Sequence, residues 1–180
     1  MLNRRTVLSG LMTGLVAATG WSVPALAINA QRRALHVRNI HTGERLDLVY
    51  WANGKYLDKS LTAYDHLLRD HHLHRVMAIH PKVYDLLWIV QVALHPKGAI
   101  EILSGYRSAA TNRMLAYATD GVAQHSYHIQ GKAVDISIPG ARPDIVAAAA
   151  QAVRFGGVGR YRGFVHLDTG PPASGPSDGA

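Results

Sequence analysis

Cysteine is absent from the 180-residue sequence, and this absence limits the covalent and metal chemistry open to the chain. Without cysteine there are no disulfide bonds, and any metal ion must be held by histidine, aspartate or glutamate. Acidic residues are also scarce, with 12 Asp and Glu against 19 Lys and Arg. The basic residues are scattered, without a basic run or interleaved aromatic residues, so nucleic acid is the weakest candidate among anionic partners.

The first 27 residues have the pattern of an export signal. Arg4 and Arg5 are followed by a mild apolar run to Ala18, and Ala25-Leu26-Ala27 forms a cleavage signature. The uninterrupted apolar run is shorter than the ~20 residues that a bilayer requires, which argues against a transmembrane anchor. The pattern predicts export by the twin-arginine route, cleavage after Ala27, and a periplasmic or cell-envelope location without stable membrane insertion.

Cleavage would leave 153 of the 180 residues and lower the formal net charge from +7 to +5, because two arginines and no acids are removed. This length suits one domain with its own core, predicted to cover residues 28–170. Residues 171–180 contain only small residues, proline and one aspartate, which predicts a disordered tail. A basic surface favours an anionic partner such as cell-wall polymer.

The hydrophobic pattern alternates between strand and helix periodicity along the chain. It predicts a hairpin from residues 35–40 and 45–51, a helix that begins at Ser60 as N-cap, and a central helix over 82–94. A strand at 99–103, a helix over 109–118 capped by Ser108, a strand after Gly131 and a helix from 143 to 153 follow. The glycine-rich segment 154–161 predicts tight turns. The expected fold is a single-domain α+β structure with a mainly antiparallel sheet and helices on one face.

The segment from His125 to Asp135 carries the chemistry. Seven extended residues would separate His128 and Asp135 by ~23 Å, so the chain must bend for the two side chains to share a metal ion. Gly131 permits the bend, because glycine adopts positive φ without steric cost. Beyond it, Asp135 lies on one face of a predicted strand, while Val134, Ile136 and Ile138 lie on the other.

A third ligand is predicted near the end of the domain. His166 and Asp168 alternate with Val165 and Leu167, so the two polar side chains share a face. Two histidines, one carboxylate and an open fourth position are typical of a catalytic zinc site, where bound water becomes a nucleophile near neutral pH. With eleven histidines in the chain, chance spacing is the alternative explanation.

A second metal site is conceivable in the segment 70–74, where His71 and His74 could share a helical face. Clustered histidines at a helix end are more often solvated and interact favourably with the helix dipole. We therefore expect one zinc ion per chain.

Three motifs together resemble a known family. Ser126-x-His128-x-x-Gly131-x-Ala133-x-Asp135, preceded by Ser104-Gly105-Tyr106-Arg107 and followed by Val165-His166, resembles the zinc peptidases related to D-Ala-D-Ala dipeptidases, D-alanyl-D-alanine carboxypeptidases and the hedgehog domain. Within these, the YcbK-like murein endopeptidases are the most similar, and the resemblance spans about residues 35–170.

The resemblance implies a hedgehog-like fold in which His128, Asp135 and His166 hold zinc. It also implies that Arg107 and Ser126, with Tyr106 of the same motif, contact the substrate. One departure concerns the general base, since the dipeptidases carry a glutamate three residues before the last histidine and this chain has Gly163 there.

The base must therefore come from another residue. Asp168 is the first candidate, and its alternative role is to orient His166. His125 is the second, because an unperturbed imidazole titrates near ~6.5. The third is a residue that only the fold would bring near.

The predicted function is that of an exported, monomeric zinc metallopeptidase that hydrolyses peptide cross-links of peptidoglycan, with stem peptides as its substrate and no nucleic-acid partner. Two alternatives remain. One is a non-catalytic zinc- or peptidoglycan-binding module, which the missing glutamate favours, and the other is a D,D-carboxypeptidase. The products formed from cross-linked muropeptides would distinguish the three.

Overall fold

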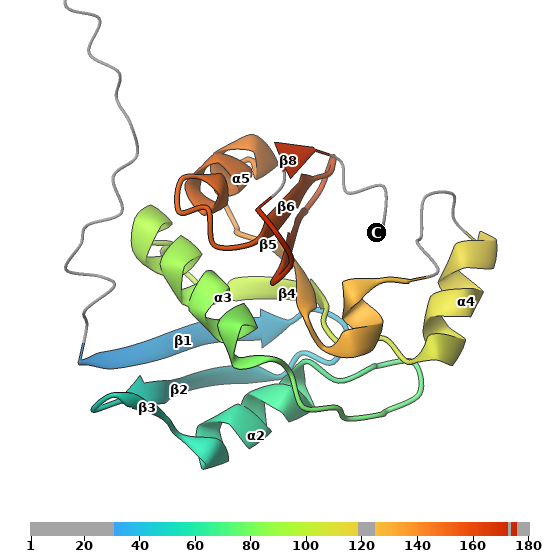
Figure 1. Ribbon diagram of the computed structural model, residues 1–180, viewed down its shortest axis with the longest axis horizontal. Coiled ribbons are helices and arrows are strands. Elements are labelled where there is room, and N and C mark those ends of the chain that lie inside the picture. Colours follow the sequence, from blue (N-terminus) through green and yellow to red (C-terminus); the bar gives the residue numbers. More distant parts are fainter. Residues whose placement is uncertain (1–30, 119–124, 173, 176–180) are drawn as a thin grey trace, which may run out of the picture.

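The computed structural model describes residues 31–118, 125–172 and 174–175 (Figure 1). The predicted export signal, the loop 121–124 and residues 176–180 of the predicted tail lie outside them. The described strands are β1 Arg32–Asn39, β2 Arg45–Ala52, β3 Lys55–Tyr56, β4 Ile100–Ser104, β5 Ala133–Ser137, β6 Gly157–Arg160, β7 Val165–Asp168 and β8 Ser174–Gly175. The helices are α2 Asp58–Leu67, α3 Pro81–Leu94, α4 Ala109–Ala118 and α5 Pro143–Gln151, with a 3₁₀ helix, η1, at Tyr127–Gln130.

The strands form one sheet in the order β3-β2-β1-β4-β5-β7-β6-β8. β1 and β2 form the predicted antiparallel hairpin, and β4, β5, β7 and β6 also pair antiparallel in succession. The β1–β4 and β6–β8 pairs are parallel. The mainly antiparallel α+β fold predicted from the sequence is therefore confirmed.

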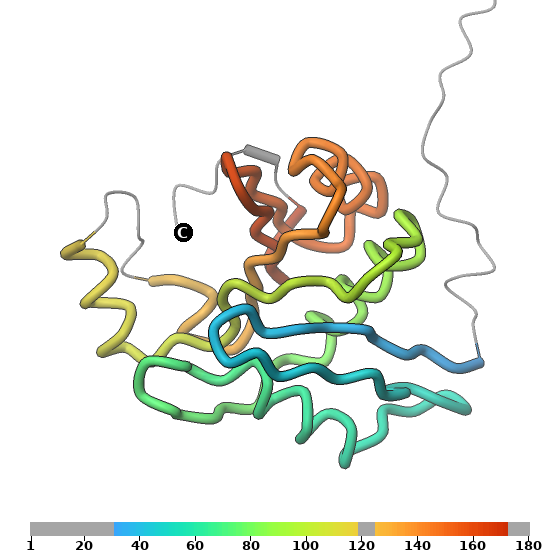
Figure 2. The backbone as a smooth tube through the Cα atoms, turned by 180° about the vertical axis from the view of Figure 1, so that it is seen from behind, coloured from blue at the N-terminus to red at the C-terminus, as the bar shows by residue number. Residues whose placement is uncertain are grey.

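Helix α3 lies at the centre of the core, as its continuous apolar pattern predicts. Pro81 occupies its first turn, where the missing N–H costs nothing, and His80 caps the helix through its side chain. Residues 83–90 of α3 are all buried, and all except Asp85 pack with residues of α2, α5 and the sheet in one hydrophobic cluster. Viewed from behind, the hairpin strands and α4 lie on opposite sides of η1, and α4 projects away from the other helices (Figure 2).

Three elements differ from the sequence-based expectation. Helix α2 begins at Asp58, three residues earlier than expected, with Leu57 and not Ser60 as its N-cap. The segment predicted as turns contains strand β6, because Gly156 and Gly157 let the backbone approach β7 closely: an added Cβ at Gly156 would lie 1.9 Å from the Asp168 carbonyl oxygen. Strand β8 lies in the segment predicted to be disordered, where backbone pairing with β6 needs no large side chain.

The predicted bend between His128 and Asp135 is a short 3₁₀ helix closed by glycine. The Ser126 hydroxyl accepts a hydrogen bond from the His128 N–H and caps η1. Gly131 follows with φ of 64°, in the left-handed region that favours glycine. A Cβ there would also lie 2.8 Å from the Ala78 carbonyl oxygen, so both conformation and space require glycine.

Candidate metal centre

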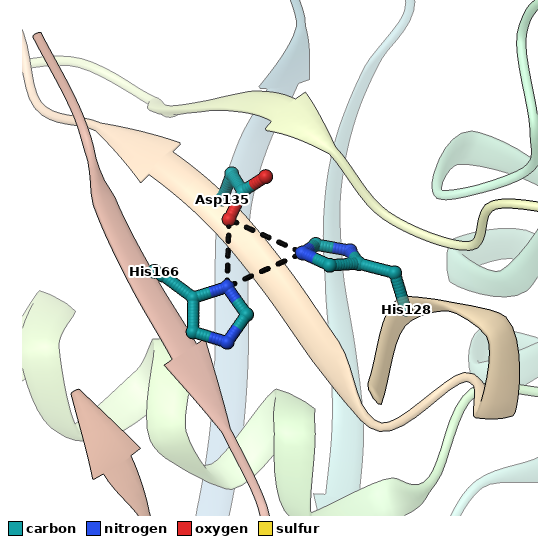
Figure 3. A group of neighbouring side chains, drawn as sticks. All are labelled: His128, Asp135 and His166. Carbon is teal, nitrogen blue, oxygen red and sulfur yellow. Dashed lines mark hydrogen bonds and ion pairs between the residues drawn. The ribbon is translucent and has the colours of Figure 1, made fainter. Parts of the chain in front are cut away.

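The three predicted ligands come together from three elements (Figure 3). His128 Nε2 lies 3.2 Å from Asp135 Oδ1 and 3.2 Å from His166 Nδ1, and His166 Nδ1 lies 2.8 Å from Asp135 Oδ1. Ligand atoms at ~2.0–2.1 Å around a tetrahedral zinc ion are separated by ~3.3 Å. The three atoms therefore have nearly the spacing that zinc requires, and small outward movements would seat the ion.

Strand register and the η1 bend produce this arrangement. Asp135 of β5 and His166 of β7 are direct partners across an antiparallel ladder, so their side chains emerge on the same face. Val134 and Ile136 project to the other face and pack in the core. The bend at η1 turns His128 back over this pair, and all three side chains are buried.

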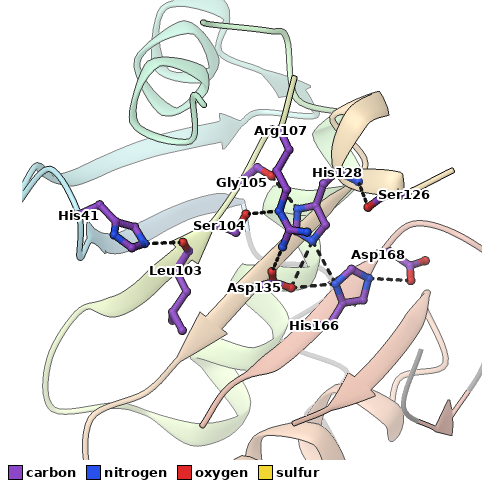
Figure 4. Close-up of polar contacts among 10 residues, drawn as sticks. All are labelled: His41, Leu103, Ser104, Gly105, Arg107, Ser126, His128, Asp135, His166 and Asp168. Atoms are coloured by element: carbon purple, nitrogen blue, oxygen red, sulfur yellow. Dashed lines mark hydrogen bonds and ion pairs between the residues drawn. The ribbon is translucent and has the colours of Figure 1, made fainter. Parts of the chain in front are cut away.

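The second nitrogen of each histidine ring is also held (Figure 4). His128 Nδ1 lies 2.7 Å from the Gly105 carbonyl oxygen, and because a carbonyl only accepts, Nδ1 carries the proton. In the neutral ring, Nε2 then presents its lone pair to the centre. His166 Nε2 lies 3.3 Å from Asp168 Oδ2, on the opposite side of the ring from the nitrogen that faces Asp135. Such contacts fix the orientation of metal-binding histidines.

The carboxylate of Asp168 lies close against Gly157 and Gly170. Its Oδ1 accepts a hydrogen bond of 2.6 Å from the Gly170 N–H. A Cβ at Gly157 would lie 2.4 Å from Oδ2, and one at Gly170 would lie 2.8 Å from Oδ1. A side chain at either glycine position would therefore collide with the Asp168 carboxylate. Its position against His166 Nε2 supports the orienting role, one of the two roles predicted for Asp168.

Arg107 contacts a predicted metal ligand. Its Nη2 donates to Asp135 Oδ2, and its Nε donates to the Ser104 hydroxyl at 2.8 Å. Asp135 Oδ2 is therefore held by the guanidinium, while Oδ1 faces the two histidines and can bind a metal ion. Sequence reasoning missed this contact and the Gly105 carbonyl, because each joins segments more than 20 residues apart in the chain.

The electrostatics of the two histidines differ. Burial lowers the pKa of His128 and keeps its ring neutral. Burial acts in the same direction on His166, but its contacts with Asp135 and Asp168 outweigh it and raise the pKa to about 9. Burial opposes the charged form of Asp135, yet His128, His166 and Arg107 together lower its pKa. The donor set therefore favours a positive charge between Asp135 and His166, and a divalent cation provides one.

The other predicted site residues, Ser126, Tyr106 and His125, have different surroundings and exposure. Ser126 is buried and caps η1, and Tyr106 is half-buried against the core, with its N–H donating to the Leu68 carbonyl. His125 is exposed and lines a pocket with residues of α4. The substrate and catalytic roles of these residues remain predictions.

None of the helices that the structure describes has the length and hydropathy needed to cross a bilayer. No solved structure matches this chain significantly.

The relatives of this chain agree with the geometry. Residues 27–174 match the family model described as peptidoglycan L,D-endopeptidase MepK. The chain is 36% identical over 173 residues to the peptidoglycan L,D-endopeptidase MepK of Escherichia coli K12, covering 94% of each chain. It is 39% identical over 153 residues to a probable enzyme of the same name from Haemophilus influenzae, covering 83% of this chain and 82% of that one. The chain therefore belongs to the MepK family and is a peptidase.

Proposed function

We propose that this peptidase is a zinc-dependent endopeptidase that opens peptide cross-links of peptidoglycan. The observation that carries the proposal is the convergence of His128 Nε2, Asp135 Oδ1 and His166 Nδ1 in a chain of the MepK family. The donor set excludes thiolate and matches the histidine–carboxylate ligation of catalytic zinc. Zinc, when bound, would polarise the scissile carbonyl and lower the pKa of a water molecule.

The surrounding residues hold the donors in place. The Gly105 carbonyl fixes the tautomer of His128, and Asp168 orients His166 through Nε2. Arg107 holds Oδ2 of Asp135 and leaves Oδ1 for the metal. Because Asp168 is held by His166 and Gly170, His125 is the proposed acceptor of the water's proton, from an exposed position two residues before η1.

The proposed substrate bond follows from the relatives' name. An L,D-endopeptidase cleaves between an L- and a D-configured centre. The sequence does not distinguish two kinds of cross-link, D-Ala–diaminopimelate and diaminopimelate–diaminopimelate, because both present similar amide and carboxylate groups. Of these two, the link between diaminopimelates joins an L- to a D-configured centre. We therefore propose it as the substrate, acted on in the cell envelope after twin-arginine export of the chain.

The test is to incubate zinc-loaded protein with purified cross-linked muropeptide dimers of each type and to separate the products. Conversion of diaminopimelate–diaminopimelate dimers to monomers is expected. Loss of a terminal D-Ala alone would indicate a carboxypeptidase, and binding without any product would indicate a non-catalytic module. The His128→Ala protein is the matched control, because it removes one predicted ligand, a buried side chain, and leaves the exposed surface unchanged.

A further inference from the structure

A pocket of about 430 Å³ lies between α4 and η1. One wall is a face of α4, where Ala109, Arg113 and Tyr117 recur every four residues and so lie above one another. The opposite wall contains Ile129 and His125. This volume is within the ~300–1,000 Å³ typical of small-ligand sites.

The segments that carry the two walls are hydrogen-bonded to each other next to the predicted metal ligands. The Arg107 N–H, two residues before α4, donates to the His128 carbonyl at 3.2 Å. The ring of His128 in turn donates to the Gly105 carbonyl. Ile129 directly follows His128, and Ala109 lies two residues after Arg107, so each wall begins next in the chain to a residue of the metal centre or its surroundings.

The dimensions of the pocket suit an extended peptide. Ala109 and Tyr117 are eight residues apart on a helix, which corresponds to ~12 Å along the wall. An extended peptide advances ~3.3 Å per residue, so three to four residues fit along this length. Tyr117, at the end of this face farthest from Arg107, is 91% exposed and presents an aromatic surface to solvent.

The charge of the pocket favours a carboxylate. Arg113 is its one permanently charged residue among the described lining residues, and these include no acid. No ion pair with a described carboxylate involves Arg113, unlike Arg107, which is held by Asp135. A planar guanidinium binds a carboxylate through two parallel hydrogen bonds.

We propose that this pocket is a subsite for a short, extended, carboxylate-bearing peptide, with Arg113 as its anchor. If the chain acts on peptidoglycan, as proposed above, the ligand is the stem peptide on one side of the scissile bond. That identification rests on the proposed function, whereas the binding of an acidic peptide does not. The subsite would place the scissile bond at the metal by fixing the substrate several residues away from it.

The kinetic test uses the zinc-loaded protein with Arg113→Glu and Arg113→Gln. Both variants are expected to raise KM for cross-linked muropeptides on the order of tenfold, the scale of a charged hydrogen bond, with kcat nearly unchanged. Arg45→Glu, at an exposed arginine of β2 that does not line the pocket, is the control for net charge and should keep the original KM. An unchanged KM in both Arg113 variants, with zinc content and circular dichroism intact, would refute the subsite.

The binding test separates the subsite from the proposed function. The probe is a synthetic L-Ala-D-Glu-diaminopimelate tripeptide, compared with the same peptide amidated at its carboxylates, both measured by calorimetry. The acid form should bind on the order of tenfold more tightly, and Arg113→Glu should abolish this preference. Equal affinity for the two forms would overturn the subsite even if cross-links are cleaved. Tight Arg113-dependent binding without cleavage would overturn the proposed function and keep the subsite.

Discussion

Two buried aspartates in this molecule have opposite surroundings. Asp85 of α3 accepts hydrogen bonds from Arg33 Nη1 and Tyr50 Oη on Oδ1, both at 2.8 Å, and from Tyr56 Oη on Oδ2 at 2.7 Å. Asp135 of β5 has a guanidinium on Oδ2 but two imidazole nitrogens facing Oδ1. Both carboxylates are buried and both contact an arginine, so burial and charge pairing alone do not identify a functional acid.

The difference lies in whether the partners can release their protons. Burial, together with Asp85, raises the pKa of Tyr56 to about 12 and raises that of Tyr50 as well. Arg33 stays charged and lies between the Trp51 and Trp88 rings, with its Cζ 4.4 and 4.9 Å from their centroids. The three groups that donate hydrogen bonds to Asp85 therefore keep their protons near neutral pH. The imidazoles beside Asp135 can present lone pairs instead, so only this carboxylate can share a cation with them.

Removal of a ligand should have the largest effect. His128→Ala, Asp135→Ala and His166→Ala are each expected to bring zinc well below one equivalent and to abolish hydrolysis, because two donors hold the ion poorly. Metal analysis of each purified variant measures this. Full zinc occupancy in the His128→Ala protein would contradict the assignment.

Asp85→Ala should damage the fold and not the metal site. It leaves the Arg33 charge and two tyrosine hydroxyls buried without their acceptor, and such losses cost ~3–5 kcal/mol in free energy of unfolding. Urea denaturation measures the cost, and zinc content of the folded fraction should stay near one equivalent. Zinc loss without a change in stability would show that the two regions are not separate.

Asp168→Asn sharpens the comparison within the metal site. If Asp168 orients His166, zinc affinity should fall ~10- to 100-fold, and activity should fall with it and recover at saturating zinc. If Asp168 is the general base, zinc affinity stays nearly intact while the rate falls roughly 10²- to 10⁴-fold. Competition with a chromogenic chelator, combined with kcat at saturating zinc, separates the two roles. The contact with Nε2 favours the first result.

Arg107→Lys should have the smallest effect. Lysine keeps the positive charge but cannot contact Ser104 and Asp135 together as the guanidinium does. Zinc should be retained, and kcat/KM should fall roughly tenfold. Wild-type turnover in this variant would show that Arg107 contributes only a positive charge beside Asp135, which lysine can replace.

Local pattern predicted much of this architecture. Alternation predicted which face of β5 and β7 carries Asp135 and His166, and the need for a bend pointed to Gly131. These are local properties, set by the two-residue period of a strand and by the steric freedom of glycine. The three metal-binding atoms accordingly lie where the motif indicated, within 4.8 Å of one another.

Contacts between distant segments were not predictable in this way. The Asp85 cluster joins residues more than 25 positions apart, and the apolar pattern of α3 gives no sign of it. Strand β6 was missed because its glycines are selected by their closeness to Asp168, not by strand propensity. The Arg107–Asp135 contact likewise follows from the β4–β5 pairing.

The direct pairing of Asp135 with His166 also determines where the chain can change in length. Between their strands lie α5 and β6, and the turn at Gly140 is exposed, with φ of 83° and no atom within 4 Å of where a Cβ would lie. Residues inserted at Gly140 lengthen a loop, whose closure cost grows only slowly with length. One residue inserted beside Asp135 would shift the register and turn the carboxylate into the core. Insertions and deletions in relatives of this chain should therefore accumulate at the turn and be excluded from β5 and β7.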